Sequence, residues 1–133
     1  MAGVDVVDRD GRSSLHAAAH ANDAARVVDL IAAGADLDLQ DKMGMAPLHL
    51  AAQEYAVDAA HLLLEAGASV DLVDERGNSP LFVATFNSRG RGNLIVLLRE
   101  YGADPDLVNR HGQTPRRLAE RIANYDITQF FAR

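Results

Sequence analysis

The sequence predicts an all-α solenoid of about four stacked units, each a pair of antiparallel helices with a hairpin-like finger. The first observation is an internal repeat of 33 residues, which relates Leu15, Leu48 and Leu81. The second is that apolar residues recur three and four positions apart within each unit, the period of an amphipathic helix. The third is that the first and last units are more polar than the inner ones, as the two ends of a stacked array require.

Composition bounds the possible functions. The chain has 133 residues, 48% of them hydrophobic, which predicts a single globular domain over residues 1–133 that is monomeric on its own. There is no cysteine, which excludes disulfides, thiolate metal sites and cysteine nucleophiles. Neither a signal peptide nor an apolar run of ~18 residues is evident, so we expect a cytoplasmic protein without a membrane partner. The net charge of −6 disfavours nucleic-acid binding, because phosphates would be repelled.

The second unit shows how each helix is delimited. Residues 41–44 have the composition of a turn, and Pro47 stands where a first helical turn tolerates a missing N–H, so a helix is predicted over 47–54. Apolar spacing predicts a second helix over 57–66, which Gly67 ends by adopting a left-handed conformation. Residues 68–74 then form an extended finger. The same pattern along the chain predicts units at about 8–40, 41–73, 74–108 and 109–133.

The repeat slips once, in the third unit. Gly102 follows Gly67 by 35 residues rather than 33, and the two extra residues fit best in the run 88–92. This run places Arg89 and Arg91 between the two helices of an otherwise acidic unit. Two interpretations stay open. The loop is either a second contact site for an acidic or phosphate group, or a flexible connection far from the fingers.

The repeated residues resemble the ankyrin-repeat family, whose period is 33 and whose signature is Thr-Pro-Leu-His-x-Ala. The runs at 47–52 and 62–68 follow the family pattern nearly in full. The runs at 14–19 and 79–84 follow it with substitutions, and 114–119 opens a shortened fourth unit, so the resemblance covers about residues 8–133. It implies a non-enzymatic protein-protein interaction module whose contact surface is the concave side formed by finger tips and first helices.

The end units depart from the repeat in the way that caps would. In the first unit Arg26 and Asp29 replace the alanine and leucine of the second unit, as an exposed outer helix needs. The last unit replaces the Leu-His pair of the signature with Arg116 and Arg117. Phe130 and Phe131 are predicted to close the exposed end of the core.

The histidines are the one candidate for a chemical site. His16 and His20 are four residues apart, a spacing that binds zinc on one helix face, so a metal-dependent hydrolase is the alternative of another class. No glutamate lies between them to act as a base. The resemblance instead gives His16 and His49 a structural role between neighbouring units, while His61 and His111 are expected to face solvent. We therefore predict no catalytic residue, no metal and no cofactor.

Mapping the family's concave surface onto this sequence gives the candidate partner-binding residues. Two methionines on one turn, with Phe86 one unit along, form an apolar strip that solubility alone does not favour. The alternative is that Met43 and Met45 fold back on their own finger. The full predicted set is Arg9, Asp10, Arg12, His20, Lys42, Met43, Met45, Gln53, Glu54, Glu75, Arg76, Asn78, Phe86, Asn87, Arg110, His111, Gln113 and Arg121.

The expected partner is another protein with a basic surface, because this chain is acidic. An arginine-rich, lysine-poor composition hints at a bacterial origin. The chain is similar to small bacterial ankyrin proteins encoded beside toxins, which implies an immunity protein that neutralises a cognate toxin or effector. The alternative within protein binding is an adaptor or assembly factor for a cellular enzyme.

Overall fold

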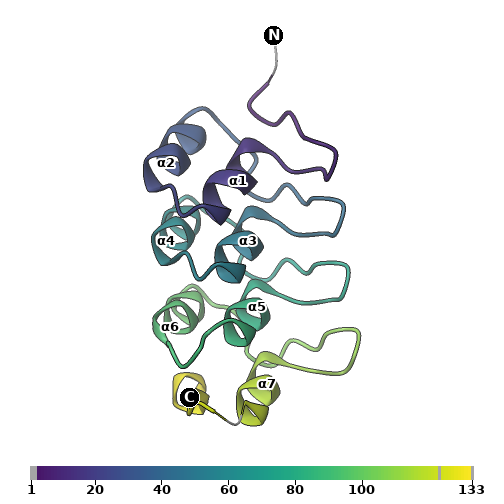
Figure 1. Ribbon diagram of the computed structural model, residues 1–133, viewed down its shortest axis with the longest axis vertical. Coiled ribbons are helices and arrows are strands. Elements are labelled where there is room, and N and C mark those ends of the chain that lie inside the picture. The colour runs from purple at the N-terminus through teal and green to yellow at the C-terminus, as the bar shows by residue number, and fades with distance from the viewer. Residues whose placement is uncertain (1–2, 123, 133) are drawn as a thin grey trace.

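The computed structural model describes residues 3–122 and 124–132, so residues 1–2, 123 and 133 of the predicted domain lie outside the described part. No helix in the described ranges is long and apolar enough to cross a membrane. Figure 1 shows an inner column of helices beside the fingers and an outer column on the other side. The described residues form α1 (Ser14–His20), α2 (Ala24–Ala32), α3 (Pro47–Gln53), α4 (Val57–Glu65), α5 (Pro80–Phe86), α6 (Asn93–Glu100), α7 (Pro115–Arg121) and the 3-10 helix η1 (Thr128–Phe131), without a strand.

Short polar residues and prolines start the inner helices. The side chains of Ser13, Ser79 and Thr114 accept hydrogen bonds from backbone N–H groups three residues on, which satisfies one free donor of the first turn. Proline occupies the first position of α3, α5 and α7. The glycines after the outer helices adopt the left-handed conformation, with φ of 101° at Gly67, which confirms this residue as the stop after α4.

Each finger is held by an aspartate or asparagine at its base. The Asp41 carboxylate accepts hydrogen bonds from the N–H groups of Met43 and Met45, at 2.9 and 2.8 Å. Asp8, Asp74 and Asn109 repeat this arrangement in the other fingers. One backbone bond joins each finger to the next, from N–H groups at positions 42, 75 and 110. The fingers are therefore turns, each closed by several hydrogen bonds of its own and joined to the next finger by one backbone bond, and they lack the strands of a true hairpin in the part described.

Two buried histidines connect the first three units. In His49 the Nδ1 atom accepts from the N–H of Ala46 at 3.0 Å, so the proton lies on Nε2, which donates to the carbonyl of Asn78 at 2.9 Å. His16 makes the equivalent bonds to Ser13 and to the Met45 carbonyl. Burial lowers the pKa of His49 and favours this neutral form. The structural role that the resemblance implied for both residues is present.

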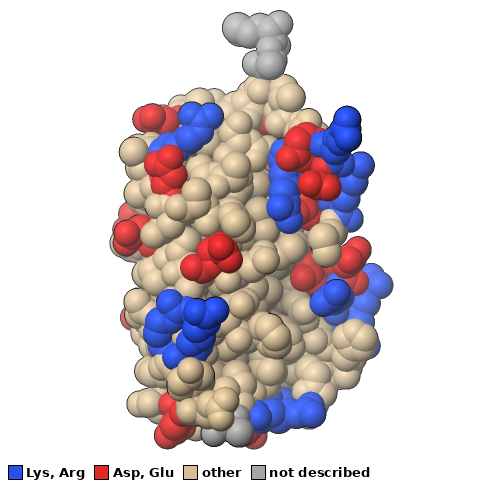
Figure 2. Space-filling view, viewed as in Figure 1, with Lys and Arg blue, Asp and Glu red and all other residues tan. Residues whose placement is uncertain are grey.

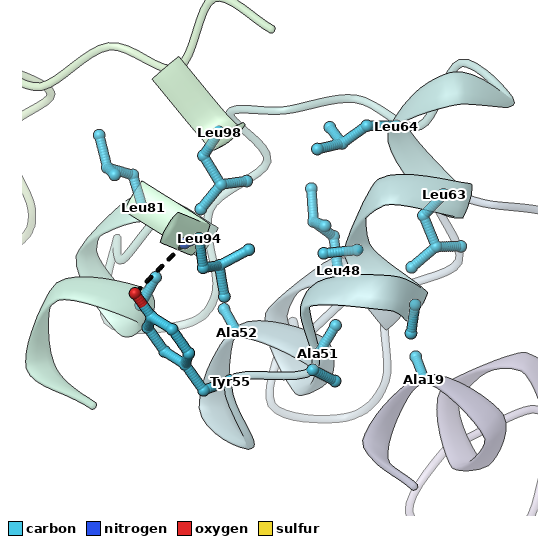
Figure 3. Close-up of a cluster of buried hydrophobic side chains, with 14 of the residues drawn as sticks. Ala19, Leu48, Ala51, Ala52, Tyr55, Leu63, Leu64, Leu81, Leu94 and Leu98 are labelled. Atoms are coloured by element: carbon cyan, nitrogen blue, oxygen red, sulfur yellow. Dashed lines mark hydrogen bonds between the residues drawn. The ribbon is translucent and has the colours of Figure 1, made fainter. Parts of the chain in front are cut away.

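The core follows the seam between the two helix columns. Figure 3 shows Leu48, Leu63, Leu81 and Leu94 meeting there, and all four are buried. Alanines on the inner helices allow close approach of neighbouring units. At the edge of this core the Tyr55 hydroxyl donates to the carbonyl of Arg91 at 2.6 Å and accepts from the N–H of Leu94 at 3.3 Å, which ties α3 to the loop before α6.

The fourth unit has no second α-helix within the described residues, and η1 lies in the outer column in its place (Figure 1). Phe131 is 1% exposed and joins the core as predicted, whereas Phe130 is only partly buried against it. Arg116 donates to the carbonyl of Phe131 at 2.7 Å and to the Asp106 carboxylate at 2.8 Å. Arg99 donates to the carbonyls of Phe130 and Ala132. Arginines thus anchor the end of the chain to the solenoid.

The inserted run 88–92 packs against this C-terminal segment. A Cβ atom at Gly90 would lie 2.7 Å from the Tyr125 ring, and one at Gly92 would collide with the Phe130 ring. Arg91 donates to the carbonyls of residues 87 and 88 and lies over the Tyr55 ring at 4.1 Å. The two glycines of the insertion therefore leave room for the aromatic rings of Tyr125 and Phe130. Arg91 keeps its contacts and is still exposed, as Arg89 is, so partner contact by both arginines stays a prediction.

Candidate binding site

A groove of about 390 Å³ opens between the second and third fingers, the exposed face of α5 and the C-terminal end of α3. The finger turns fix one wall, and α5 supplies the other. This volume lies within the range of sites that hold a ligand or a partner's side chains. Nine of the predicted contact residues line it: Arg12, Met43, Met45, Gln53, Glu75, Arg76, Asn78, Phe86 and Asn87.

The apolar part of the groove comes from one finger and one helix. Met43 is 45% exposed and Phe86 is 70% exposed, so neither side chain is required to fill the core. Met45 is half-buried. Nearly half of Met43 is therefore accessible to a partner, whereas the burial of Met45 is equally compatible with packing on its own finger. Large apolar side chains that stay accessible in a concave site are typical of protein-binding surfaces.

The charged groups of the groove differ in how firmly they are held. Arg12 forms an ion pair of 3.1 Å with Asp41, whose side chain is almost fully buried. Asp74 accepts two backbone bonds in its finger turn. Figure 2 shows acidic and basic side chains next to one another over the fingers. Glu75 and Arg76 are both exposed, and no hydrogen bond within the described residues engages their charged ends. The first two groups therefore shape the groove, and the last two are available to a ligand.

The remaining predicted contacts lie outside the groove. Arg9, Asp10 and Lys42 are exposed on the first two fingers. His20 and Glu54 lie beside the groove at the ends of neighbouring inner helices, with 3.7 Å between Nε2 and Oε1. In the fourth unit Arg121 donates to the Gln113 side chain at 3.2 Å, and Arg110 and His111 are exposed on the last finger. The predicted set therefore forms a central groove with separate extensions at both ends.

Three groove residues were not predicted from the sequence. Phe82 and Val83 lie four and three positions before Phe86, so all three share one face of α5, and Asp74 is the base of the third finger. The helical spacing could have identified the two apolar residues. Phe82 occupies the repeat position of the buried histidine His49, so the repeat pattern alone does not mark it as a surface residue.

The histidine pair offers no arrangement for zinc. Both ring nitrogens of His16 are engaged by Ser13 and Met45, and the ring is fully buried, whereas His20 is exposed and faces Glu54. Across residues 3–122 and 124–132, no three histidine or carboxylate side chains gather as metal ligands would. His61 and His111 are exposed, as predicted, and His61 pairs with Glu65 at 3.1 Å.

Comparison with known proteins agrees with this architecture. A family model for ankyrin repeats in three copies matches residues 15–109, a range that includes the middle finger-to-finger bond and both histidine connections. No protein with curated function matches the sequence. Proteins of the matching family are generally interaction modules without enzymatic activity. The matched range, the stacked helix pairs and the repeated finger turns together show that the chain belongs to the ankyrin-repeat family.

Proposed function

We propose that the chain is a non-catalytic module that binds another protein through the groove between the second and third fingers. The observation that carries this proposal is the pair of exposed apolar side chains, Met43 and Phe86, on opposite walls of the groove. Neither residue is needed for the core. Together they offer an adaptable and an aromatic contact to a partner side chain.

The groove is held in shape by the fold before any partner binds. The Asp41 and Asp74 turns fix the two fingers, and the bond from the N–H of Glu75 to the carbonyl of Met43, at 2.9 Å, fixes the distance between them. Binding therefore orders few backbone groups, which preserves more of the interaction free energy. An apolar side chain of the partner inserts between Met43 and Phe86, while Glu75 and Arg76 contact polar groups at the rim.

A narrower form of this proposal is an immunity function against a basic bacterial toxin. The net charge of −6 and the exposed carboxylates of Asp10, Glu54 and Glu75 near the groove support it. In this form Glu54→Lys and Glu75→Lys slow association and reduce its dependence on salt, because rim charges act mainly by steering. An adaptor for an acidic cellular enzyme gives the opposite change in rate, so stopped-flow association with a purified partner separates the two.

The test of the groove uses matched substitutions of exposed apolar residues. A partner captured from the native host should lose affinity by more than ~1 kcal/mol with Met43→Ala or Phe86→Ala, mainly through faster dissociation. Val28→Ala on α2 and Tyr101→Ala after α6 remove exposed apolar side chains elsewhere and should leave affinity unchanged. If the groove variants and the controls bind equally well, the contact surface lies elsewhere and the proposal is wrong.

A further inference from the structure

A second groove is lined by residues of α4, α6 and η1 and of the loop before α6. These helices form the outer column, on the side away from the fingers (Figure 1). The volume of the groove is about 480 Å³. Val57, Val96, Leu97 and Phe130 form an apolar floor, and Val96 is 39% exposed. The Phe130 ring reaches this surface because Gly92 has no side chain to block it. The insertion in the third unit therefore creates an apolar surface that a regular repeat would lack.

The charged carboxylates that line this second groove are not balanced by a lysine or arginine in its lining. Asp58 on α4 and Glu100 on α6 line it and are exposed, and His61, which also lines it, pairs with Glu65 at 3.1 Å. Arg99 of α6 lines the adjoining hollow, where it donates to two C-terminal carbonyls at 2.8 Å each. The floor is thus apolar, and its rim is anionic.

We propose that this outer groove binds a basic amphipathic segment of a partner protein, with an apolar side chain on Val96 and Phe130 and flanking lysines or arginines on Asp58 and Glu100. Charge complementarity selects this occupant. An acidic segment would be repelled by the rim. A second copy of the chain would place two anionic rims against each other, so self-association is disfavoured. The proposal goes beyond the finger groove, because it assigns a separate surface on the opposite column.

The probe is a fluorescein-labelled, helix-forming peptide of 16 residues with leucines on one face and lysines beside them. A peptide of the same composition with its leucines spread around the helix tests for the apolar floor, and a version with glutamate in place of lysine tests for the rim. Fluorescence anisotropy should show binding of the first peptide that weakens as salt rises, and at least tenfold weaker binding of the other two.

Matched variants assign the binding to the groove. Asp58→Asn with Glu100→Gln should weaken binding about tenfold, whereas Asp29→Asn with Glu120→Gln, which changes the net charge equally at exposed positions that line neither groove, should change it less than twofold. Val96→Ser should weaken binding, and Val28→Ser, on the exposed α2 surface, should not. Thermal unfolding of every variant verifies that each is folded. Amide shifts in nuclear magnetic resonance spectra should concentrate in Val57–His61 and Asn93–Glu100.

Each other outcome overturns the proposal. Equal weakening by both charge pairs would indicate attraction to net charge alone, and shifts confined to the fingers would place the peptide in the first groove. Tight binding of the glutamate peptide would reverse the assigned charge. A dimer of the chain that the peptide disrupts would assign the groove to a second copy. Met43 and Phe86 line the finger groove alone, so the Met43→Ala and Phe86→Ala variants should bind the peptide as the wild type does. If the peptide does not bind at the outer groove, the proposal for the finger groove is therefore unaffected.

Discussion

The interface between the second and third units and the interface between the third and fourth units are held together by different contacts. Between the second and third units, the buried ring of His49 connects backbone atoms of both, and alanines allow close packing. In the fourth unit Arg117 occupies the histidine position and donates to the Gly112 carbonyl of its own finger at 3.1 Å. The apolar side of the fourth unit is covered by Phe131. Arg116 and Arg99 hold this segment in place by donating hydrogen bonds to the carbonyls of residues 131 and 130.

The difference separates contacts that repeat from contacts that occur once. A repeated contact needs only neighbouring units, so its stabilisation is added at each interface. The C-terminal contact instead joins η1 to two other parts of the chain at once, the insertion with α6 on one side and α7 on the other. We expect the end of the chain to be more sensitive to single substitutions than the middle, and the following predictions test this, from the largest effect to the smallest.

Phe131→Ala should have the largest effect. The side chain is 1% exposed, and removing a buried phenylalanine costs about 3–5 kcal/mol, a large part of the free energy of unfolding of a domain. Chemical denaturation measures this loss. Tyr125→Ala removes an exposed aromatic residue of the same segment and should cost much less. Equal effects of the two substitutions would contradict a core role for η1.

His49→Ala should have the next largest effect, about 1–3 kcal/mol. It removes two hydrogen bonds and leaves the Ala46 N–H and the Asn78 carbonyl without these partners. His20→Ala, at an exposed position one unit away, should change the unfolding free energy by less than about 0.5 kcal/mol. If His20→Ala proves as costly as His49→Ala, the structural distinction between the two histidines is wrong.

Gly92→Ala should destabilise the chain by about 1 kcal/mol, the lower end for overpacking, because Phe130 is half-exposed and can swing outward. The backbone itself accepts alanine, since φ at Gly92 is −108°. A double-mutant cycle with Phe130→Ala supplies the control, because the cost of Gly92→Ala should largely vanish when the ring is absent. Additive effects would show that the residue at position 92 does not contact the Phe130 ring.

Acidification should reduce stability by the smallest amount. Burial lowers the pKa of His49 in the folded chain below its ordinary value of 6.5, so the unfolded chain binds this proton first as the pH falls. The contribution is complete above about pH 6.5 and is lost progressively below it, toward the folded pKa. Urea titrations at pH 7.5 and 5.5 measure the loss. It should be smaller in His49→Gln, which has no titrating ring.

The sequence predicts the repeated part of the molecule well because that part depends on local patterns. The helices at 47–54 and 57–66 begin at the predicted residues and end one residue earlier. Gly67 ends its helix, and Arg26 and Asp29 are exposed on α2 as predicted. The first groove collects half of the predicted contact residues because they occupy equivalent positions in adjacent units.

The rest depends on contacts between segments that no local pattern relates. The run 88–92 gave two interpretations, and neither foresaw that its glycines face the aromatic rings of residues 125 and 130. Phe130 was expected in the core but reaches the outer groove. Such placements follow from how the chain end folds back over the third unit, which single-sequence periodicity does not encode.

The finger-to-finger bonds have a consequence for how this surface can change. The donors and acceptors are backbone groups, as in the bond from the N–H of Lys42 to the carbonyl of Asp10 at 2.9 Å. Other side chains, such as Arg12 with Asp41 and Asn109 with Asn78, also join neighbouring fingers, but the side chains of Lys42 and Arg76 take no part in these bonds among the described residues. A substitution at Lys42 or Arg76 can therefore alter what the surface recognises without altering how the units stack. At Lys42 and Arg76, the side-chain atoms that can contact a ligand differ from the backbone atoms that align the fingers. These tip positions are therefore suitable for randomisation in a binding library.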